Sequence, residues 1–308
     1  MSAISIDPHL RRFIEEPPEK APDTSEGAGL PTQFTFPLGQ PISSIGVGKV
    51  VASASPLFRA GDQIRAEYFP WEKYAVFPDT AITPIRDTGR PLTDYVGVLG
   101  MTPFTAYLGL VGVGAPTAGE MLLVSAASGA VGQIAVQLGK ARGLRVIGVV
   151  GSDEKADYVK SIGADAVLNY KTCGNYVSAI RKLAPEGVDI YFDNVGGELL
   201  DAVLLNLNTR ARVIICGSIA TYSSDKTKGA GVKNLDTIIT KEVTLKAIFY
   251  LPHMGTAIEK DFFQEMTALV EQEKIKYRLD VRDGLESAPQ ALVDLFTGAN
   301  FGKVIVRA

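Results

Sequence analysis

The fold of this chain is decided by residues 121–152, which read MLLVSAASGAVGQIAVQLGKARGLRVIGVVGS. Two apolar runs within it, 121–125 and 145–150, are each long enough for one buried strand. Between them, residues 134–141 have the apolar spacing of a helix. A strand, a tight turn, a helix and a second strand in about 30 residues match one dinucleotide-binding βαβ unit, so we expect a nucleotide cofactor here.

The turn between the first strand and the helix, residues 126–132, consists of small residues and one valine. Its pattern is A-x-G-x-x-G, with Ala127 in place of the first glycine of the full motif. Small residues let the backbone approach a pyrophosphate, and the free N–H groups that begin the helix favour its negative charge. An ordinary strand-to-helix turn is the alternative, which the flanking strands and helix disfavour. The cofactor contacts expected in this turn are Ser128, Gly129, Ala130, Val131 and Gly132.

Composition narrows the class of protein. The 308 residues are enough for two domains with a large core, and a net charge of -3 argues against a nucleic-acid partner. Two cysteines, Cys173 and Cys216, are too few for a disulfide framework or a four-thiolate zinc site, and we expect no metal. We find neither an apolar run of the roughly 18 residues that span a bilayer nor a secretory signal. We therefore expect a cytoplasmic protein that does not bind membranes.

From residue 94 onward, strands alternate with helices, which predicts an α/β fold with a doubly wound, mostly parallel sheet. The ligand crevice of such a sheet lies at the carboxyl ends of its strands. The expected helices are 95–113, 155–162, 176–183, 198–207, 260–274 and 290–296, and the further strands are 166–168, 188–193, 212–216, 244–250 and 302–307.

The residues before 94 have a different texture, with short apolar runs and frequent turn residues that predict a smaller β-rich domain. Residues 71–77 are predicted as a short aromatic strand, and residues 15–29, rich in Pro, Glu and Gly, as an exposed loop. We assign residues 1–95 and 257–308 to a β-rich substrate domain, and 96–256 to a dinucleotide-binding domain.

Several stretches from about residue 95 to the end of the chain carry a family resemblance. They are 126–132, 151–155, 169–172, 192–197, 216–222 and 300–306. With them the chain resembles the zinc-independent branch of the medium-chain dehydrogenase/reductases, namely the prostaglandin reductases and alkenal/one double-bond reductases. The resemblance implies a Rossmann domain, a GroES-like β-rich domain, an NADPH cofactor and a small-molecule substrate.

The chain departs from that family at its start. Residues 5–12 also look like a family stretch, which in the family follows several strands of the β-rich domain. We therefore expect that domain to be partly truncated, without its first strands. Uncovered apolar core would favour association of two copies, so we expect a homodimer.

The end of the second strand indicates which cofactor is bound. Val150 is followed by glycine and Ser152 rather than by the acidic residue that meets a free ribose 2′-hydroxyl, and Lys155 lies one turn on. The resemblance gives Lys155 and Tyr170 to the 2′-phosphate of NADPH. The alternative is that Ser152 only caps a helix and Lys155 is a solvated surface residue. The acidic residues 153–154 weaken the purely electrostatic argument.

Other cofactor contacts follow from the resemblance. Asn194 would lie along the cofactor, and Asn300 would also contact it, although both could be ordinary turn residues. Cys216 could equally be a small buried apolar residue. The remaining expected contacts are Gly217, Ser218, Tyr222, Ile248, Phe249 and Tyr250.

Tyr222 is the expected catalytic residue. The resemblance places it facing the nicotinamide and the substrate carbonyl, where its hydroxyl could stabilise an enolate or serve in protonation. A packing role is the alternative. The leading hypothesis is NADPH-dependent reduction of the carbon–carbon double bond of α,β-unsaturated carbonyl compounds. Two others stay open: a non-redox role on a bulky natural product, with the fold or NADPH binding retained, and a quinone reductase.

Overall fold

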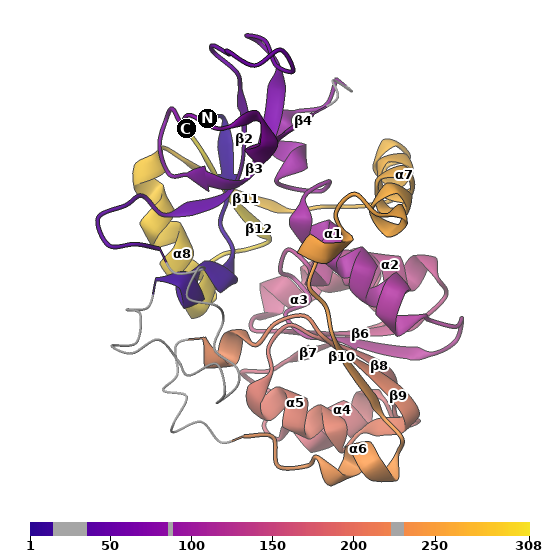
Figure 1. Cartoon of the computed structure of the whole chain (residues 1–308). Helices are drawn as coiled ribbons and strands as arrows, with labels where there is room; N and C mark the ends of the chain where they lie inside the picture. The colour runs from indigo at the N-terminus through magenta and orange to yellow at the C-terminus, as the bar shows by residue number, and fades with distance from the viewer. Residues whose placement is uncertain (15–35, 86–88, 223–230) are drawn as a thin grey trace, which may run out of the picture. The chain divides into compact units, whose positions relative to one another are not determined.

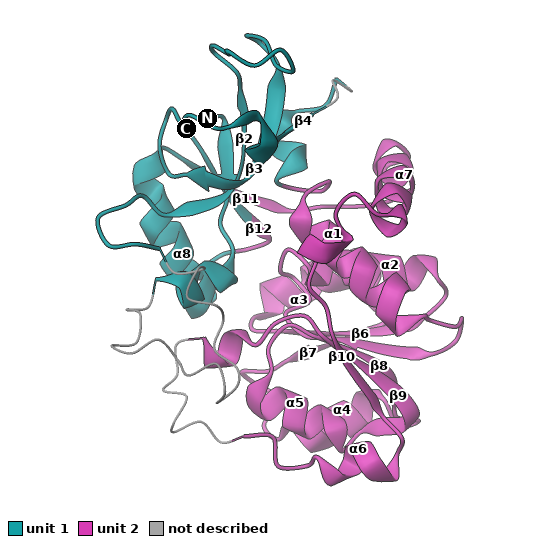
Figure 2. Ribbon diagram, viewed as in Figure 1, with its two compact units in different colours: residues 1–96, 281–300, 304–308 teal, residues 97–280, 301–303 magenta. Residues whose placement is uncertain are grey.

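The computed structural model describes residues 1–14, 36–85, 89–222 and 231–308. They form two compact units, coloured separately in Figure 2. Unit 1 comprises Met1–Val96, Val281–Asn300 and Val304–Ala308, and unit 2 comprises Gly97–Asp280 and Phe301–Lys303. The predicted loop 15–29 lies outside the described residues.

Unit 2 is built on a six-stranded parallel sheet in the order β10-β9-β8-β5-β6-β7. From the central pair of β5 and β8, the strands follow in chain order to each edge, β6 and β7 on one side and β9 and β10 on the other. This order confirms the predicted doubly wound fold. In such folds the ligand crevice forms where the order reverses, which here is between β5 and β8. The strands are β5 (Met121–Val124), β6 (Arg145–Val150), β7 (Ala166–Asn169), β8 (Val188–Asp193), β9 (Leu207–Ile215) and β10 (Thr244–Ala247).

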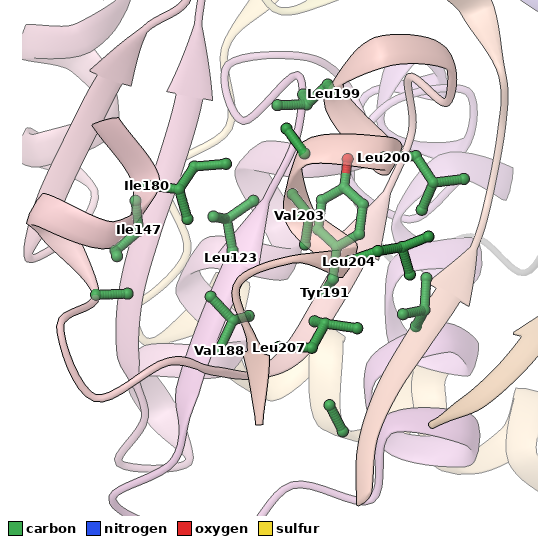
Figure 3. Packing of buried hydrophobic residues seen from close by; sticks show 14 of the residues in the cluster. Leu123, Ile147, Ile180, Val188, Tyr191, Leu199, Leu200, Val203, Leu204 and Leu207 are labelled. Carbon is green, nitrogen blue, oxygen red and sulfur yellow. The ribbon is translucent and has the colours of Figure 1, made fainter. Parts of the chain in front are cut away.

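Helices cover both faces of this sheet, with α2 and α3 on one face and α4 and α5 on the other (Figure 1). Figure 3 shows the core beneath α5, where Leu199 and Val203 of the helix pack with Leu123 and Tyr191 of the sheet. Each such side chain contributes roughly 1.5–3 kcal/mol on burial. The helices of unit 2 are α1 (Met101–Tyr107), α2 (Gly132–Ala141), α3 (Asp153–Ser161), α4 (Tyr176–Leu183), α5 (Gly197–Leu204), α6 (Asp236–Thr240) and α7 (Ala257–Glu271).

Two predicted helices of unit 2 end differently in the structure. The expected helix 198–207 stops at Leu204, because the side chain of Asn206 donates to the carbonyl of Ala202 at 2.9 Å, and β9 begins at Leu207. The expected helix 95–113 is instead α1 followed by a π-helix over Leu108–Gly114.

Unit 1 contains most of a second six-stranded sheet in the order β11-β12-β1-β2-β3-β4, whose pairs from β12 to β4 are antiparallel. The buried side chains Ile4, Leu292 and Val304 form part of its core. The strands are β1 (Ala3–Ser5), β2 (Ser43–Lys49), β3 (Gln63–Pro70), β4 (Ile82–Pro84), β11 (Leu279–Asp283) and β12 (Lys303–Arg307), and α8 (Ala288–Thr297) is the helix.

The predicted aromatic strand 71–77 is wrong, because these residues form bends and coil. The aromatic strand is β3, where Phe69 is buried. Its ladder with β2 ends at the Ser43–Pro70 pair, and the Trp71 indole then donates to Ser44 Oγ at 3.0 Å. β4 supplies the next strand of the sheet instead.

The compact units divide the chain differently from the predicted domains, since residues 257–280 belong to unit 2. Phe262 of α7 is fully buried and its ring lies 5.2 Å from Phe104 of α1. Gln137 of α2 then exchanges two hydrogen bonds with the backbone of Lys276, both of 2.7 Å. These contacts fix the segment to the parallel-sheet unit, and apolar spacing alone gave no sign of them.

Candidate functional site

The turn after β5 is shaped by Gly132, the first residue of α2. A Cβ at this position would overlap the carbonyl oxygen of Ala126 and lie 2.7 Å from the Cα of Ala127. Gly129 is also close to this carbonyl oxygen, because its N–H donates to Ala126 O at 2.9 Å. Only glycine therefore allows α2 to begin in contact with the backbone of residues 126–127 in the turn after β5, where the free N–H groups of the helix favour an anion.

At the neighbouring strand end, Asn194 is held across the β5–β8 pair. Its backbone N–H donates to Ser125 Oγ at 2.8 Å, and its side-chain amide donates to Ser125 O at 2.7 Å. The half-buried Asn194 therefore stands at the switch point of the sheet. Its side chain is oriented by its bond to Ser125 O, as a turn residue's would be, and the contact of Asn194 with the cofactor stays a prediction.

Asp193, fully buried before it, organises the loop that follows β8. Its Oδ1 accepts from the Tyr191 hydroxyl at 2.8 Å and from the N–H groups of Val195 and Gly196, both at 2.9 Å. Burial raises the pKa of Asp193, although these donors act in the opposite direction. This side chain was not singled out in the sequence, because it follows an apolar run as an ordinary strand end would.

The turn after β6 brings a lysine and a tyrosine to one place. Ser152 Oγ accepts from the backbone N–H of Lys155 at 3.3 Å, so the serine caps α3 as one alternative held. The Tyr170 ring lies against Gly151, where a Cβ would be 2.8 Å from the hydroxyl oxygen. Glycine at this position is what lets the tyrosine lie beside the start of α3.

Lys155 is not merely a solvated surface residue. It is half-buried, and its pKa is lowered by burial and by the ammonium group of Lys171, while Glu154 and Asp280 act to raise it. The charge of Lys171 thus acts on Lys155, and an anion near these two ammonium groups would be favoured. Sequence reasoning missed Lys171, although it lies inside the stretch 169–172 that carried the resemblance.

Tyr222 lies beyond the carboxyl end of β9, with its hydroxyl against the segment Gly217–Ser218. The backbone N–H of Ser218 donates to the Tyr222 hydroxyl oxygen at 3.2 Å. A Cβ on Gly217 would lie 3.1 Å from the same oxygen. The Tyr222 hydroxyl oxygen is therefore the acceptor in this bond, which holds the hydroxyl beside the backbone of residues 217–218. Burial and the charge of Asp193 raise the pKa of the Cys216 thiol to about 12, which makes it an inert neighbour.

The last group of expected contacts is divided between the units. Ile248, Phe249 and Tyr250 follow β10, which ends at Ala247 rather than at the predicted residue 250, and Ile248 N–H still donates to Ile215 O at 3.0 Å. Asn300 belongs to unit 1, so it is not among the residues that unit 2 brings together.

Over the described residues, no three His, Cys, Asp or Glu side chains gather in a way that could hold a metal ion. In the same part of the chain, every helix is too short or too polar to cross a bilayer.

Comparisons with known proteins agree on one family. A family described as "Zinc-binding dehydrogenase" matches residues 130–272. The 2-alkenal reductase (NADP(+)-dependent) of Nicotiana tabacum is 40% identical, over 98% of this chain and 84% of its own. The NADPH-dependent curcumin reductase of Escherichia coli is 35% identical, over 99% of this chain and 85% of its own length. The crystal structure of CurA from Vibrio vulnificus in complex with NADPH superposes with a TM-score of 0.87 at 32% identity, over 100% of this chain and 88% of the other.

Proposed function

Because the chain belongs to the zinc-independent medium-chain dehydrogenase/reductases, in their alkenal/one double-bond reductase branch, we propose that it reduces the carbon–carbon double bond of α,β-unsaturated carbonyl compounds. The chain is an oxidoreductase and its cofactor is NADPH. The observation that supports this choice of substrate is the position of the Tyr222 hydroxyl, which the Ser218 N–H holds beyond the carboxyl end of β9.

The residues of unit 2 fit the cofactor. Gly129 and Gly132 leave the backbone open for a diphosphate at the start of α2. Lys155 and Tyr170 lie at the neighbouring strand end, where the adenosine 2′-phosphate would be held. When bound, NADPH supplies a hydride to the β-carbon of the substrate. The ammonium groups of Lys155 and Lys171 support a phosphorylated ribose rather than a free one, because a 2′-phosphate would interact favourably with both charges and a 2′-hydroxyl would not.

Tyr222 acts on the carbonyl end of the substrate. Its hydroxyl donates a hydrogen bond to the carbonyl oxygen and so stabilises the negative charge that develops there as the enolate forms. The enolate carbon then takes a proton from Tyr222 or from a water molecule that it orients. The Asn194 side chain is held by Ser125 O, and the Gly217 N–H donates to Asp193 O at 3.1 Å, so the segments beside Tyr222 are fixed to the strand ends.

The test is a panel of enones, aldehydes and quinones mixed with protein and NADPH, in which the loss of NADPH absorbance is followed and the products are identified. We expect saturated ketones or aldehydes from the enones, and a Tyr222→Phe variant with kcat lowered about 10–100-fold at an unchanged NADPH affinity. Turnover of quinones alone, or no NADPH oxidation with any enone, would reject the proposal.

We also propose that the protein is a cytoplasmic homodimer formed through β10. This strand is the outer edge of the parallel sheet, and all four of its residues are exposed. Leu245 on the strand is 43% exposed and Ile239 of α6 is 81% exposed. An exposed edge strand that carries Leu245, with Ile239 exposed on the nearby helix, supports pairing with a second copy. Light scattering should give twice the chain mass, and Leu245→Lys should give the monomer; a wild-type monomer would contradict the dimer.

A further inference from the structure

Asn169, the last residue of β7, joins the two turns that hold Lys155 and Tyr170. Its side-chain Nδ2 donates to Asp153 Oδ1 at 2.8 Å, and its Oδ1 accepts from the backbone N–H of Lys171 at 3.1 Å. A carboxylate can only accept and a backbone N–H can only donate, so the two partners together fix which way the amide points.

Asp153 is the acidic residue that makes this contact important. It is the first residue of α3, directly after the capping Ser152 and two positions before Lys155. A carboxylate this near to Lys155 in the chain would repel a 2′-phosphate that is bound at that lysine. The Asp153 carboxylate would therefore weaken binding of NADPH. The side chain of Asn169 donates a hydrogen bond to one of the two oxygens of this carboxylate.

We propose that Asn169 is a positioning residue for cofactor selectivity, which holds the Asp153 carboxylate toward β7 and so keeps the space beside Lys155 open for the 2′-phosphate. The inference rests on the NADPH site proposed above. It adds a role for a side chain that does not touch the cofactor. Through its bond to Lys171 N–H, the same amide also sets the course of the backbone that carries the second lysine.

A purely structural role makes a different prediction. In that case Asn169 would only tie β7 to α3, and its loss would lower stability without changing which nucleotide is preferred. The two roles are separated by removing the carboxylate as well, because an Asp153→Asn background has no negative charge left for Asn169 to restrain.

The experiment measures binding of 2′,5′-ADP and of 5′-AMP to the full-length protein by calorimetry, alongside NADPH. These two probes differ in the 2′-phosphate alone. We expect Asn169→Ala to weaken the affinity for 2′,5′-ADP about fivefold and to leave the affinity for 5′-AMP unchanged. The reason is that a freed carboxylate repels only the probe that carries a 2′-phosphate. We expect Asn169→Ala combined with Asp153→Asn to recover the wild-type affinity for 2′,5′-ADP.

Asn208→Ala is the matched control. The Asn208 side chain donates to Asp189 Oδ1 at 2.7 Å, which is the same kind of pair at the amino ends of β8 and β9. Its loss should lower stability by a similar amount and leave the affinities for both probes unchanged.

Equal weakening of the two probes by Asn169→Ala, or no recovery in the double variant, would overturn the positioning role. Failure of the wild-type protein to bind NADPH at all would instead reject the proposed function, so the two failures are distinguishable.

Discussion

The turn after β5 and the turn after β6 face the same edge of the parallel sheet but differ in the atoms they use. The first is made of backbone in close contact, with Gly132 against Ala126 and the buried Asp193 holding the adjacent loop. The second presents the half-buried side chain of Lys155, beside which lies the exposed Tyr170 from the turn after β7. Substitutions of the glycines in the first turn should therefore lower stability most, whereas substitution of Lys155 in the second should mainly change ligand selectivity.

The largest effect is expected from Gly132→Ala. The added Cβ meets backbone atoms of residues 126–127 that cannot move without separating α2 from β5, and we expect a loss of about 3 kcal/mol or more in the free energy of unfolding. Urea denaturation measures it. Gly231→Ala is the control, because a Cβ there meets nothing within 4 Å. Equal losses in the two variants would contradict the comparison.

Lys155→Ala should have a smaller effect on stability and a selective effect on binding. Removing a charge-assisted contact to the 2′-phosphate should weaken NADPH by about 2 kcal/mol, or roughly 30-fold, and leave NADH unchanged. Fluorescence titration with both nucleotides checks this. A parallel loss of NADH affinity would mean that the second turn also shapes the fold.

The smallest effect is expected at the amino ends of the strands, where an ion pair between two side chains joins β9 to the residue before β5. Arg212 donates two hydrogen bonds to Glu120, of 2.7 and 2.8 Å, and lowers the pKa of that carboxyl below its ordinary value of 4.5. A lowered pKa stabilises the fold above 4.5, and this contribution is lost as the pH falls through the lowered value.

Glu120→Gln should therefore cost about 1 kcal/mol at neutral pH and progressively less as the solution is acidified. Denaturation at a series of pH values measures the difference. A cost that stays constant into acid would show that the ion pair contributes nothing through its charge.

The sequence predicted best those features that depend on neighbours along the chain. The helix α4 and the strands β6 and β8 have the predicted bounds, because each is a periodic run between glycine, proline or polar turn residues. The glycine turn was also found, since close approach of backbone requires small residues. The strand expected at 71–77 failed because its aromatic residues match a strand pattern, whereas pairing with β2 ends at Pro70.

The polar part of the site could not be predicted in the same way. The bond between Asn169 and Asp153 joins the end of β7 to the first residue of α3, 16 residues away in the sequence, and it depends on how β6 and β7 align in register. The effect of the Lys171 charge on the pKa of Lys155 depends on the same alignment of the two strands. Motif reasoning identified Lys155 and Tyr170 but gave no means of telling which neighbouring charges face them.

The central claim is that NADPH lies across the strand ends with its 2′-phosphate beside Lys155. Calorimetric titration of the wild-type protein with NADPH and with NADH tests it most directly. The account predicts that NADPH binds at one site per chain, about 100-fold more tightly than NADH. Equal affinity for the two nucleotides, or no heat from NADPH at saturating concentration, would contradict it.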